Sequence, residues 1–308
     1  MEKSRKKQNP NWDLIKSDVN LIKSICSLTE KELLFTLSDM LEKYNYRDKV
    51  LTEDYLVAEG DIPICLIAHC DTVFQFTPVE WYFDSQKRVL WSPDGAGFDD
   101  RAGIFIILKL LQAGYKPHVI FTTGEEVGGV GAFSLVSQFK KCPFRNKPKC
   151  LIELDRMGGN DCVFYDCYNK KFIKTIQNYG FKLAYGTFTD ISIIAPAWGI
   201  AAVNLSVGYY DEHTTVERLF IDETYKTLKR VAHILDDVNK LDFYKFVKRR
   251  HWKIRSQDIP MRSKINSPFC FWCNEPIEGN PHYFNAPSFG LNASTPLCDS
   301  CAKYVLDK

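Results

Sequence analysis

Residues that commonly bind metal ions stand at the ends of several apolar runs in this sequence. The runs ICLIA, VIFTTG, CLIEL and AAVNLSVG are each followed closely by such residues, and the loop SPDGAGF leads into two more. Because the carboxyl ends of strands in an open α/β sheet meet at one edge, we expect these side chains to converge there. The set comprises His69, Asp71, Asp99, Asp100, Glu125, Glu126, Asp155 and His213.

The chemistry of this set favours a hydrolytic metal site. A cluster of Asp99, Glu126 and Asp155 would be unfavourable through mutual repulsion unless cations lay among the carboxylates. Mixed imidazole and carboxylate ligands suit zinc better than calcium or magnesium, and the number of carboxylates suggests two ions. Asp71 stands two residues after His69, where it can accept a hydrogen bond from the imidazole nitrogen that does not bind metal. Any single member could instead be a helix cap or a solvated charge.

A second cluster of metal ligands lies near the C-terminus. Cys270 with Cys273, and Cys298 with Cys301, form two pairs separated by 24 residues, and each pair can present two thiolates to a tetrahedral ion. The segment 265–308 is too short to build a hydrophobic core of its own, which favours a zinc-ribbon-like module held by one structural zinc. The alternatives are accidental cysteine pairs, or His282 in place of one thiolate. A closed four-thiolate site implies a role in folding or partner contact, without catalysis.

Periodicity predicts the helices and strands that must position the first cluster. The segment SLTEKELLFTLSDMLEKY has apolar residues at helical spacing, after a capping box formed by Thr29 and Glu32. Farther along, short apolar runs alternate with helix-length amphipathic segments, a pattern typical of a sheet flanked by helices. We therefore expect an α/β catalytic domain over residues 1–244, with a central, mixed but mostly parallel sheet. A basic linker over 245–264 and the C-terminal module over 265–308 would follow.

Composition excludes several classes of protein. The chain has 308 residues, 45% hydrophobic and 25% charged, with a formal net charge of +2, so it is globally neither disordered nor a coiled coil. No apolar stretch reaches the ~18 residues that span a bilayer, and the basic N-terminus leads into no signal-like apolar region. We therefore expect a cytoplasmic protein without membrane contact. The basic segment and the C-terminal module could contact protein or nucleic acid, or the segment could be a solvated linker.

In chain order, five motifs between residues 62 and 219 resemble those of the co-catalytic di-zinc exopeptidases, the superfamily of zinc aminopeptidases, carboxypeptidases and deacylases. AHCDTV is similar to the family's His-x-Asp strand end, GAGFDDRAG to its bridging-aspartate loop, TTGEEVGGVGA to its Glu-Glu turn, ELDRMGG to its second aspartate, and DEHTTVE to its final histidine. Fewer than forty residues separate Asp71 from Asp99, and Asp155 from Asp190, which leaves no room for an inserted lid. A lidless aminopeptidase-type core therefore fits best, and the four-cysteine module departs from the family pattern.

This resemblance implies how the first cluster would bind metal. Asp99 would bridge two zinc ions, His69 and Asp155 would complete one site, and Glu126 and His213 would complete the other.

The resemblance also implies roles for residues that do not bind metal. Glu125 would be the general base and Asp71 would orient His69. A non-proline cis peptide would follow Asp99, joining it to Asp100. Asp190, in the segment TFTD, would lie near the site without binding metal.

The sequence therefore predicts a zinc-dependent hydrolase of amide or peptide bonds, most consistent with an aminopeptidase-type exopeptidase. Its expected cofactors are two catalytic zinc ions, or cobalt or manganese in their place, and its expected substrates are peptides or acyl-amino acids. A carboxypeptidase or N-acyl amino acid deacylase is an alternative, and the arginines that could bind a substrate carboxylate, or form structural ion pairs, are Arg101, Arg156 and Arg218. Candidate donors to an oxyanion are Tyr185, Tyr209 and Tyr210. A further alternative is a non-catalytic binding protein that acts through the C-terminal module. Against it, every predicted metal ligand and the predicted base are of the residue types that metal-dependent hydrolysis requires.

Overall fold

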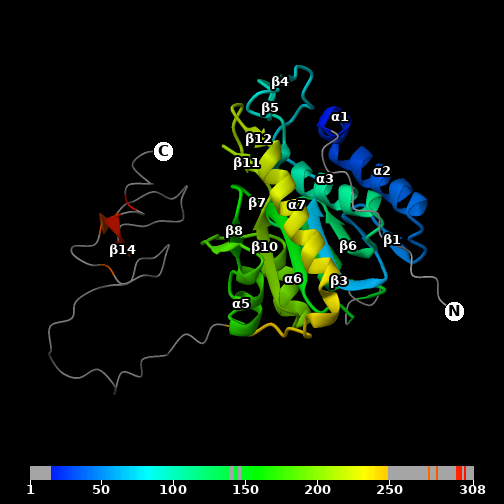
Figure 1. Cartoon of the computed structure of the whole chain (residues 1–308), viewed down its shortest axis with the longest axis vertical. Coiled ribbons are helices and arrows are strands. Elements are labelled where there is room, and N and C mark those ends of the chain that lie inside the picture. The colour runs from blue at the N-terminus through cyan, green and yellow to red at the C-terminus, as the bar shows by residue number, and fades with distance from the viewer. Residues whose placement is uncertain are drawn as a thin grey trace. The chain divides into compact units, whose positions relative to one another are not determined.

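The apolar runs form an eight-stranded sheet in the order β1-β2-β6-β3-β7-β10-β8-β9 (Figure 1). This computed structural model describes residues 15–138, 142–144 and 147–248, and nearer the C-terminus residues 277, 282–283, 296–299 and 302. The strands are β1 (Lys49–Leu51), β2 (Tyr55–Ala58), β3 (Ile62–His69), β6 (Pro117–Thr122), β7 (Leu151–Arg156), β8 (Asp161–Val163), β9 (Lys182–Leu183) and β10 (Ala202–Ser206). Strands β6, β3, β7 and β10 are parallel, whereas β2 pairs antiparallel with β1 and β6, and β8 with β10. The predicted mixed, mostly parallel sheet is confirmed.

Helices cover both faces of this sheet. On one face α3 packs against β3 and β7, and it also contacts α1 and α7, which lie beside it in Figure 1. On the other face α6 packs against β7 and β10, and α4 contacts α6 and β2. The helices are α1 (Ile15–Cys26), α2 (Glu30–Lys43), α3 (Phe98–Gln112), α4 (Val130–Ser137), α5 (Lys170–Asn178), α6 (Ile191–Trp198) and α7 (Ile221–Asp236). This is the α/β architecture that the alternating pattern predicts.

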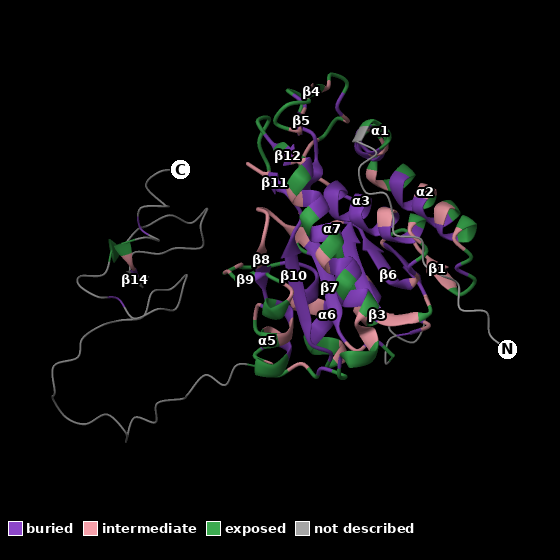
Figure 2. Cartoon of the chain, viewed as in Figure 1, coloured by how far each residue is buried: buried purple, intermediate pink, exposed green. Residues whose placement is uncertain are grey.

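Strand β3 shows how the sheet builds two hydrophobic cores. Its side chains alternate between the faces, so Leu66 and Ala68 join the core that includes α3, whereas Cys65 and Ile67 join the core that includes α4 and α6. Figure 2 shows the central strands and α3 as almost wholly buried. Strands buried on both faces are stiff, and their ends therefore make a rigid platform for side chains.

A smaller sheet lies next to the segments that lead into α3 and α7. Its strands are in the order β11-β12-β5-β4, with β11 (Tyr209–Tyr210), β12 (Arg218–Phe220), β5 (Val89–Trp91) and β4 (Tyr82–Asp84). Strand β12 pairs with β5 through Arg218 opposite Trp91. The pairing ties together two segments that are far apart in the sequence.

Helix α2 begins as its sequence predicts. The amide of Thr29 donates to Oε2 of Glu32 at 3.0 Å, and the amide of Glu32 donates to Oγ1 of Thr29 at 3.4 Å, so both halves of the capping box form. Among the described residues, no helix is both long enough and apolar enough to cross a membrane.

The chain divides into two units, Met1–Arg249 and Arg250–Lys308. Residues at the end of the first unit still pair with it, since Lys245 bridges to Ile200 and Lys248 to Cys167. In the second unit β13 (His282–Tyr283) and β14 (Pro296–Leu297) pair antiparallel. Cys298 is partly buried, whereas Cys270, Cys273 and Cys301 lie outside the described residues, as does most of the basic linker. The four-thiolate zinc site therefore stays a prediction.

Candidate metal centre

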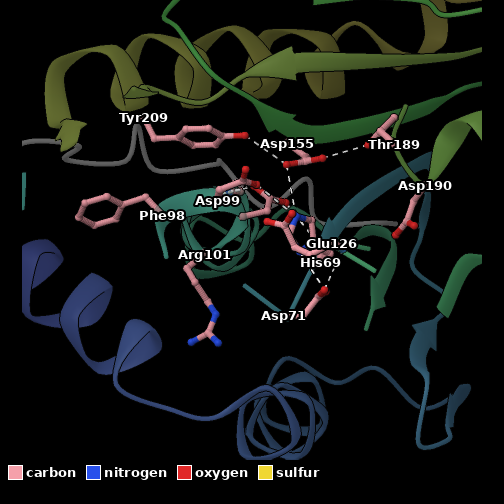
Figure 3. A network of polar contacts seen from close by, with 12 residues as sticks. His69, Asp71, Phe98, Asp99, Arg101, Glu126, Asp155, Thr189, Asp190 and Tyr209 are labelled. Atoms are coloured by element: carbon pink, nitrogen blue, oxygen red, sulfur yellow. Dashed lines mark hydrogen bonds and ion pairs between the residues drawn. The ribbon is translucent and has the colours of Figure 1, made fainter. Parts of the chain in front are cut away.

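The carboxyl edge of the parallel strands brings the first cluster together, and Figure 3 shows four of its members, His69, Asp99, Glu126 and Asp155, close to one another. His69 is the last residue of β3 and pairs with Thr122, the last residue of β6, three residues before Glu125. Asp155 lies near the end of β7, and Asp99 is the second residue of α3. The remaining histidine, His213, lies in the loop between β11 and β12. All of these side chains reach one site from separate loops.

The geometry divides the cluster into two groups that share Asp99. Its Oδ1 lies 3.2 Å from Nε2 of His69, and its Oδ2 lies 3.2 Å from Nε2 of His213. Nε2 of His69 is also 3.5 Å from Oδ1 of Asp155, and Nε2 of His213 is 2.9 Å from Oε2 of Glu126. Each group thus contains one imidazole, one carboxylate of its own and one oxygen of Asp99. This is the arrangement that a bridging role for Asp99 requires.

These donors fit a metal ion. His69, Asp99 and Glu126 each offer a ligand atom, and the three atoms lie within 4.8 Å of one another. Imidazole nitrogen together with carboxylate oxygen is the donor mixture of hydrolytic zinc sites. A possible metal site therefore exists at this edge of the sheet.

Asp71 holds two members of the cluster in place through hydrogen bonds. Its Oδ1 accepts a hydrogen bond from Nδ1 of His69 at 3.1 Å, which leaves Nε2 of the ring facing Asp99 and Asp155. Its Oδ2 accepts a hydrogen bond from the amide of Glu126 at 3.0 Å. One carboxylate therefore fixes both the ring of His69 and the turn that carries Glu125.

The backbone around Asp99 is held by two other acidic residues. The Asp99–Asp100 peptide is cis, as the resemblance implies. Asp100 is fully buried and accepts hydrogen bonds from the amides of His69 at 3.3 Å and Gly103 at 3.1 Å. Glu217 is also fully buried and accepts from the amides of Phe98 at 3.1 Å and Asp99 at 3.0 Å. Sequence reasoning gave Glu217 no role, and the only signal was its place in the motif DEHTTVE.

A network of hydrogen bonds surrounds Asp155. Oγ1 of Thr189 contacts Oδ2 of Asp155 at 2.9 Å and Oε2 of the buried Glu153 at 2.7 Å. The hydroxyl of Tyr209 donates to Oδ1 of Asp155 at 3.3 Å, whereas Tyr210 donates to Glu223. Tyr209, one of the three candidate tyrosines, is thus bonded to the cluster. Thr189 and Glu153 were not predicted, because nothing in their local sequence distinguishes them.

His213 is held in a backbone conformation that non-glycine residues rarely adopt. Its φ is 63°, and Asp211 in the same loop has a φ of 59°. A left-handed conformation costs an ordinary residue ~1–2 kcal/mol and occurs often at functional sites. The loop therefore adopts an unfavourable backbone conformation that places this imidazole against Asp99 and Glu126.

Burial and charge shift the pKa values of the cluster. Burial, followed by the charge of Asp155, raises the pKa of Glu125 to about 9. Burial and the charge of Asp99 likewise raise the pKa of Asp155 to about 7. Hydrogen bonds to Asp99 and Glu126 raise the pKa of His213 to about 11. The cluster therefore favours positive charge among its carboxylates, which is the electrostatic signature of a cation site.

Asp190 lies close to these residues, as the resemblance implies. It is fully buried, and its Oδ2 accepts a hydrogen bond from the hydroxyl of Thr122, while its Oδ1 has no hydrogen-bond partner in the part of the chain that the structure describes. Figure 3 places Asp190 to the side of Thr189, away from Asp99.

The three arginines near the cluster differ in their contacts. Arg218 forms an ion pair with Asp211, which is the structural role foreseen for it. Arg101 donates to main-chain carbonyl oxygens. Arg156 forms no ion pair with any described residue, and its Nε is buried without a hydrogen-bond partner.

Comparison with known proteins adds the fold. No family model matches the chain, and no curated protein matches it in sequence. Among solved structures it is similar to aminopeptidase PepT from Bacillus cereus, with a TM-score of 0.60, 15% identity, and coverage of 74% of this chain and 100% of that one. A tripeptidase from Staphylococcus aureus gives a TM-score of 0.60 and 15% identity, and the match covers 73% of this chain and 99% of that one. An aminopeptidase from the archaeon Desulfurococcus kamchatkensis gives a TM-score of 0.55 and 15% identity, and the match covers 74% of this chain and 98% of that one. The chain therefore has the fold of these aminopeptidases, as its motifs predict.

Proposed function

We propose that this protein is a zinc-dependent hydrolase of peptide or amide bonds, of the aminopeptidase type. The observation that carries the proposal is the pair of imidazole–carboxylate groups that share Asp99, with Glu125 on the adjoining turn. A fold in common with enzymes described as aminopeptidases and a tripeptidase supports this reaction class.

Two ions would be held by the two groups described above. His69, Asp155 and one oxygen of Asp99 would hold the first, and His213, Glu126 and the other oxygen of Asp99 would hold the second. Zinc suits these donors, and cobalt or manganese could take its place. Such ions would polarise the scissile carbonyl and lower the pKa of the attacking water. A further structural zinc would be held by Cys270, Cys273, Cys298 and Cys301.

Glu125 would move the proton in this reaction. Its carboxylate would take a proton from the attacking water and deliver it to the leaving amine. Cations bound among the carboxylates would favour the ionised form of Glu125 that a base requires, whereas its burial, which raises its pKa, would help the group to hold the proton between these two steps. The hydroxyl of Tyr209 would keep Asp155 in place.

Apolar side chains beside the cluster suggest the substrate class. Val127 is 77% exposed directly after Glu126, and Val216 is 61% exposed in the loop that carries His213. Exposed apolar groups at the edge of a polar site mark a surface that binds apolar ligand parts. We therefore expect peptides with apolar N-terminal residues to be preferred.

Arg156 keeps a second candidate function open. It follows Asp155 directly, is only partly buried and forms no ion pair among the residues described, so we propose it as the group that a substrate carboxylate would contact. That feature would favour a carboxypeptidase or an N-acyl amino acid deacylase acting at the same cluster.

One assay tests the proposal and separates these candidates. The zinc-loaded protein is given free-amine aminoacyl anilides, N-acetylated amino acids and short peptides, with Glu125→Gln and the surface control Glu53→Gln alongside. We expect the free-amine substrates to be cleaved, with a loss of ~10²–10⁴-fold in Glu125→Gln at unchanged metal content. Cleavage of blocked substrates alone would favour the second candidate. No cleavage by the metal-loaded protein, or equal rates in both variants, would overturn the proposal.

A further inference from the structure

A cavity lies next to Asp71, between this residue and the turn that joins the two N-terminal helices. It has a volume of about 200 Å³ and is lined by the turn between α1 and α2, by the segment that follows β3, and by the loop that precedes α3. Pockets for drug-sized ligands typically measure ~300–1,000 Å³, so this cavity suits a smaller molecule. In Figure 3, Arg101 and Asp71 extend away from Asp155 toward the N-terminal helices, coloured blue, which form this side of the site.

Arg101 brings a buried positive charge to this cavity. Its side chain lines the cavity, yet the residue is only 2% exposed. Nε donates to the carbonyl of Cys70 at 3.1 Å, and Nη1 donates to the carbonyls of Ile25 and Leu28, both at 2.8 Å. Nη2 has no hydrogen-bond partner, and the guanidinium forms no ion pair, in the described part of the chain. Because Nε and Nη1 already donate to carbonyl oxygens, Nη2 is the nitrogen left to donate to a ligand carboxylate.

Glu30 brings the opposite charge to the same cavity. It begins α2, where its Oε1 accepts a hydrogen bond from the amide of Gly124 at 3.0 Å, while Oε2 has no such partner among the described residues. Glu30 and Arg101 both line the cavity but form no ion pair with each other. Opposite charges that face one small space without direct contact match a ligand that carries both charges, and the carboxylate of Asp71, which also lines the space, adds to the attraction for its ammonium group. The positive end of the α2 dipole, beside Thr29, adds to the attraction for a carboxylate.

We infer that this cavity binds a free α-amino acid, with its carboxylate on Arg101 and its ammonium group on Glu30. Phe74 and Ala96 line the remaining wall and give an apolar surface for the ligand's side chain. The site is separate from the metal cluster and uses none of the proposed metal ligands.

Asp71 connects this site to the reaction. It lines the cavity while holding Nδ1 of His69 and the amide of Glu126. An amino acid in the cavity would therefore contact the residue that positions a metal ligand and the turn of Glu125. This consequence rests on the proposed function: a released amino acid would change the rate of hydrolysis by binding away from the metals.

Binding is tested directly, without reference to hydrolysis. Isothermal titration calorimetry on the full zinc-loaded chain uses glycine and L-leucine as probes, with acetate and methylamine as single-charge probes. We expect saturable binding of the amino acids, and at least ~10-fold weaker binding of either single-charge probe, because each loses one charged hydrogen bond. Glu30→Gln should weaken amino acid binding ~10-fold, whereas Glu53→Gln should not.

Two further variants decide the location of the ligand. Arg101→Lys keeps the charge but shortens its reach, so it should weaken amino acid binding, and unchanged binding in the folded variant would overturn the inference. Circular dichroism shows whether the variant folds, because Arg101 also holds the end of α1. His213→Ala alters the metal cluster and should leave binding in the cavity intact. Binding that is lost in His213→Ala but kept in Glu30→Gln would place the ligand at the metals and overturn the inference, as would no saturable binding or equal affinity for acetate. Since no outcome depends on turnover, failure of the proposed function would appear separately, in the hydrolysis assay.

Discussion

Replacement of Asp71 by asparagine tests how the structure prepares His69 to bind metal. Asp71 accepts from Nδ1 of His69 at 3.1 Å and from the amide of Glu126 at 3.0 Å. Asparagine has only one accepting oxygen, and its NH2 group is a donor. If that oxygen stays with Glu126, the NH2 group faces His69 and favours the tautomer whose proton is on Nε2. An Nε2 that carries a proton cannot bind a metal ion.

The size of the effect follows from the loss of this orienting contact. Removal of a residue that orients a metal-binding histidine typically lowers metal affinity or activity ~10–100-fold, which corresponds to about 1.4–2.7 kcal/mol. We expect this loss in Asp71→Asn, measured as zinc affinity by competition with a chromophoric chelator. Turnover at saturating metal should also fall, because a neutral amide oxygen holds the turn that carries Glu125 more weakly than the carboxylate does.

Asp94→Asn is the matched control. Asp94 also accepts hydrogen bonds from two main-chain amides, those of Val79 at 2.9 Å and Glu80 at 3.1 Å, but it lies in an exposed loop. Zinc affinity should be unchanged in this variant. Wild-type zinc affinity in Asp71→Asn would refute the reasoning, since it would mean that Asp71 does not select the state of His69.

Three other expectations concern stability and metal content. Glu217→Ala leaves two buried N–H groups without an acceptor and should lower the free energy of unfolding by about 2–4 kcal/mol, measured by urea denaturation. Burial lowers the pKa of His118 to about 4, below its ordinary 6.5. As pH falls through 6.5, the unfolded chain therefore takes up a proton that the folded chain does not. Between pH 6.5 and 4 the free energy of unfolding should fall by about 1.4 kcal/mol per pH unit because of this group. That slope should disappear in His118→Asn but persist in the exposed control His233→Asn, and equal slopes would contradict the assignment. Cys270→Ser should remove one zinc per chain in metal analysis while the hydrolytic metals stay bound; loss of those metals as well would contradict the separation of the two sites.

Much of the fold and the cluster could be predicted because the signals are local. The capping box of α2 lies within four residues, and the apolar runs that become β3, β6, β7 and β10 are each read from a few adjacent side chains. Polar residues that follow such runs converge because the strands are parallel. The contacts that fix Asp99 are of another kind, since Glu217 reaches its amide across 118 residues. Hydrophobic periodicity does not predict a contact between residues so far apart in the sequence. The strands of the small sheet are only two or three residues long, which is too short to show an alternating pattern.

The small sheet explains how Asp99 and His213, which are far apart in the sequence, come together. It joins the segment that leads to Asp99 with the segment that follows His213. Strand β5 ends at Trp91, ahead of the loop that leads to Asp99, and β12 begins at Arg218, after the loop of His213. The two strands pair at these residues, and Glu217, directly before β12, binds the amide of Asp99. The large sheet therefore positions the group of His69 and Asp155, whereas the small sheet positions His213 against the same carboxylate, that of Asp99. Two sheets that meet at Asp99 account for a cluster whose members come from separate strands, loops and a helix of the chain.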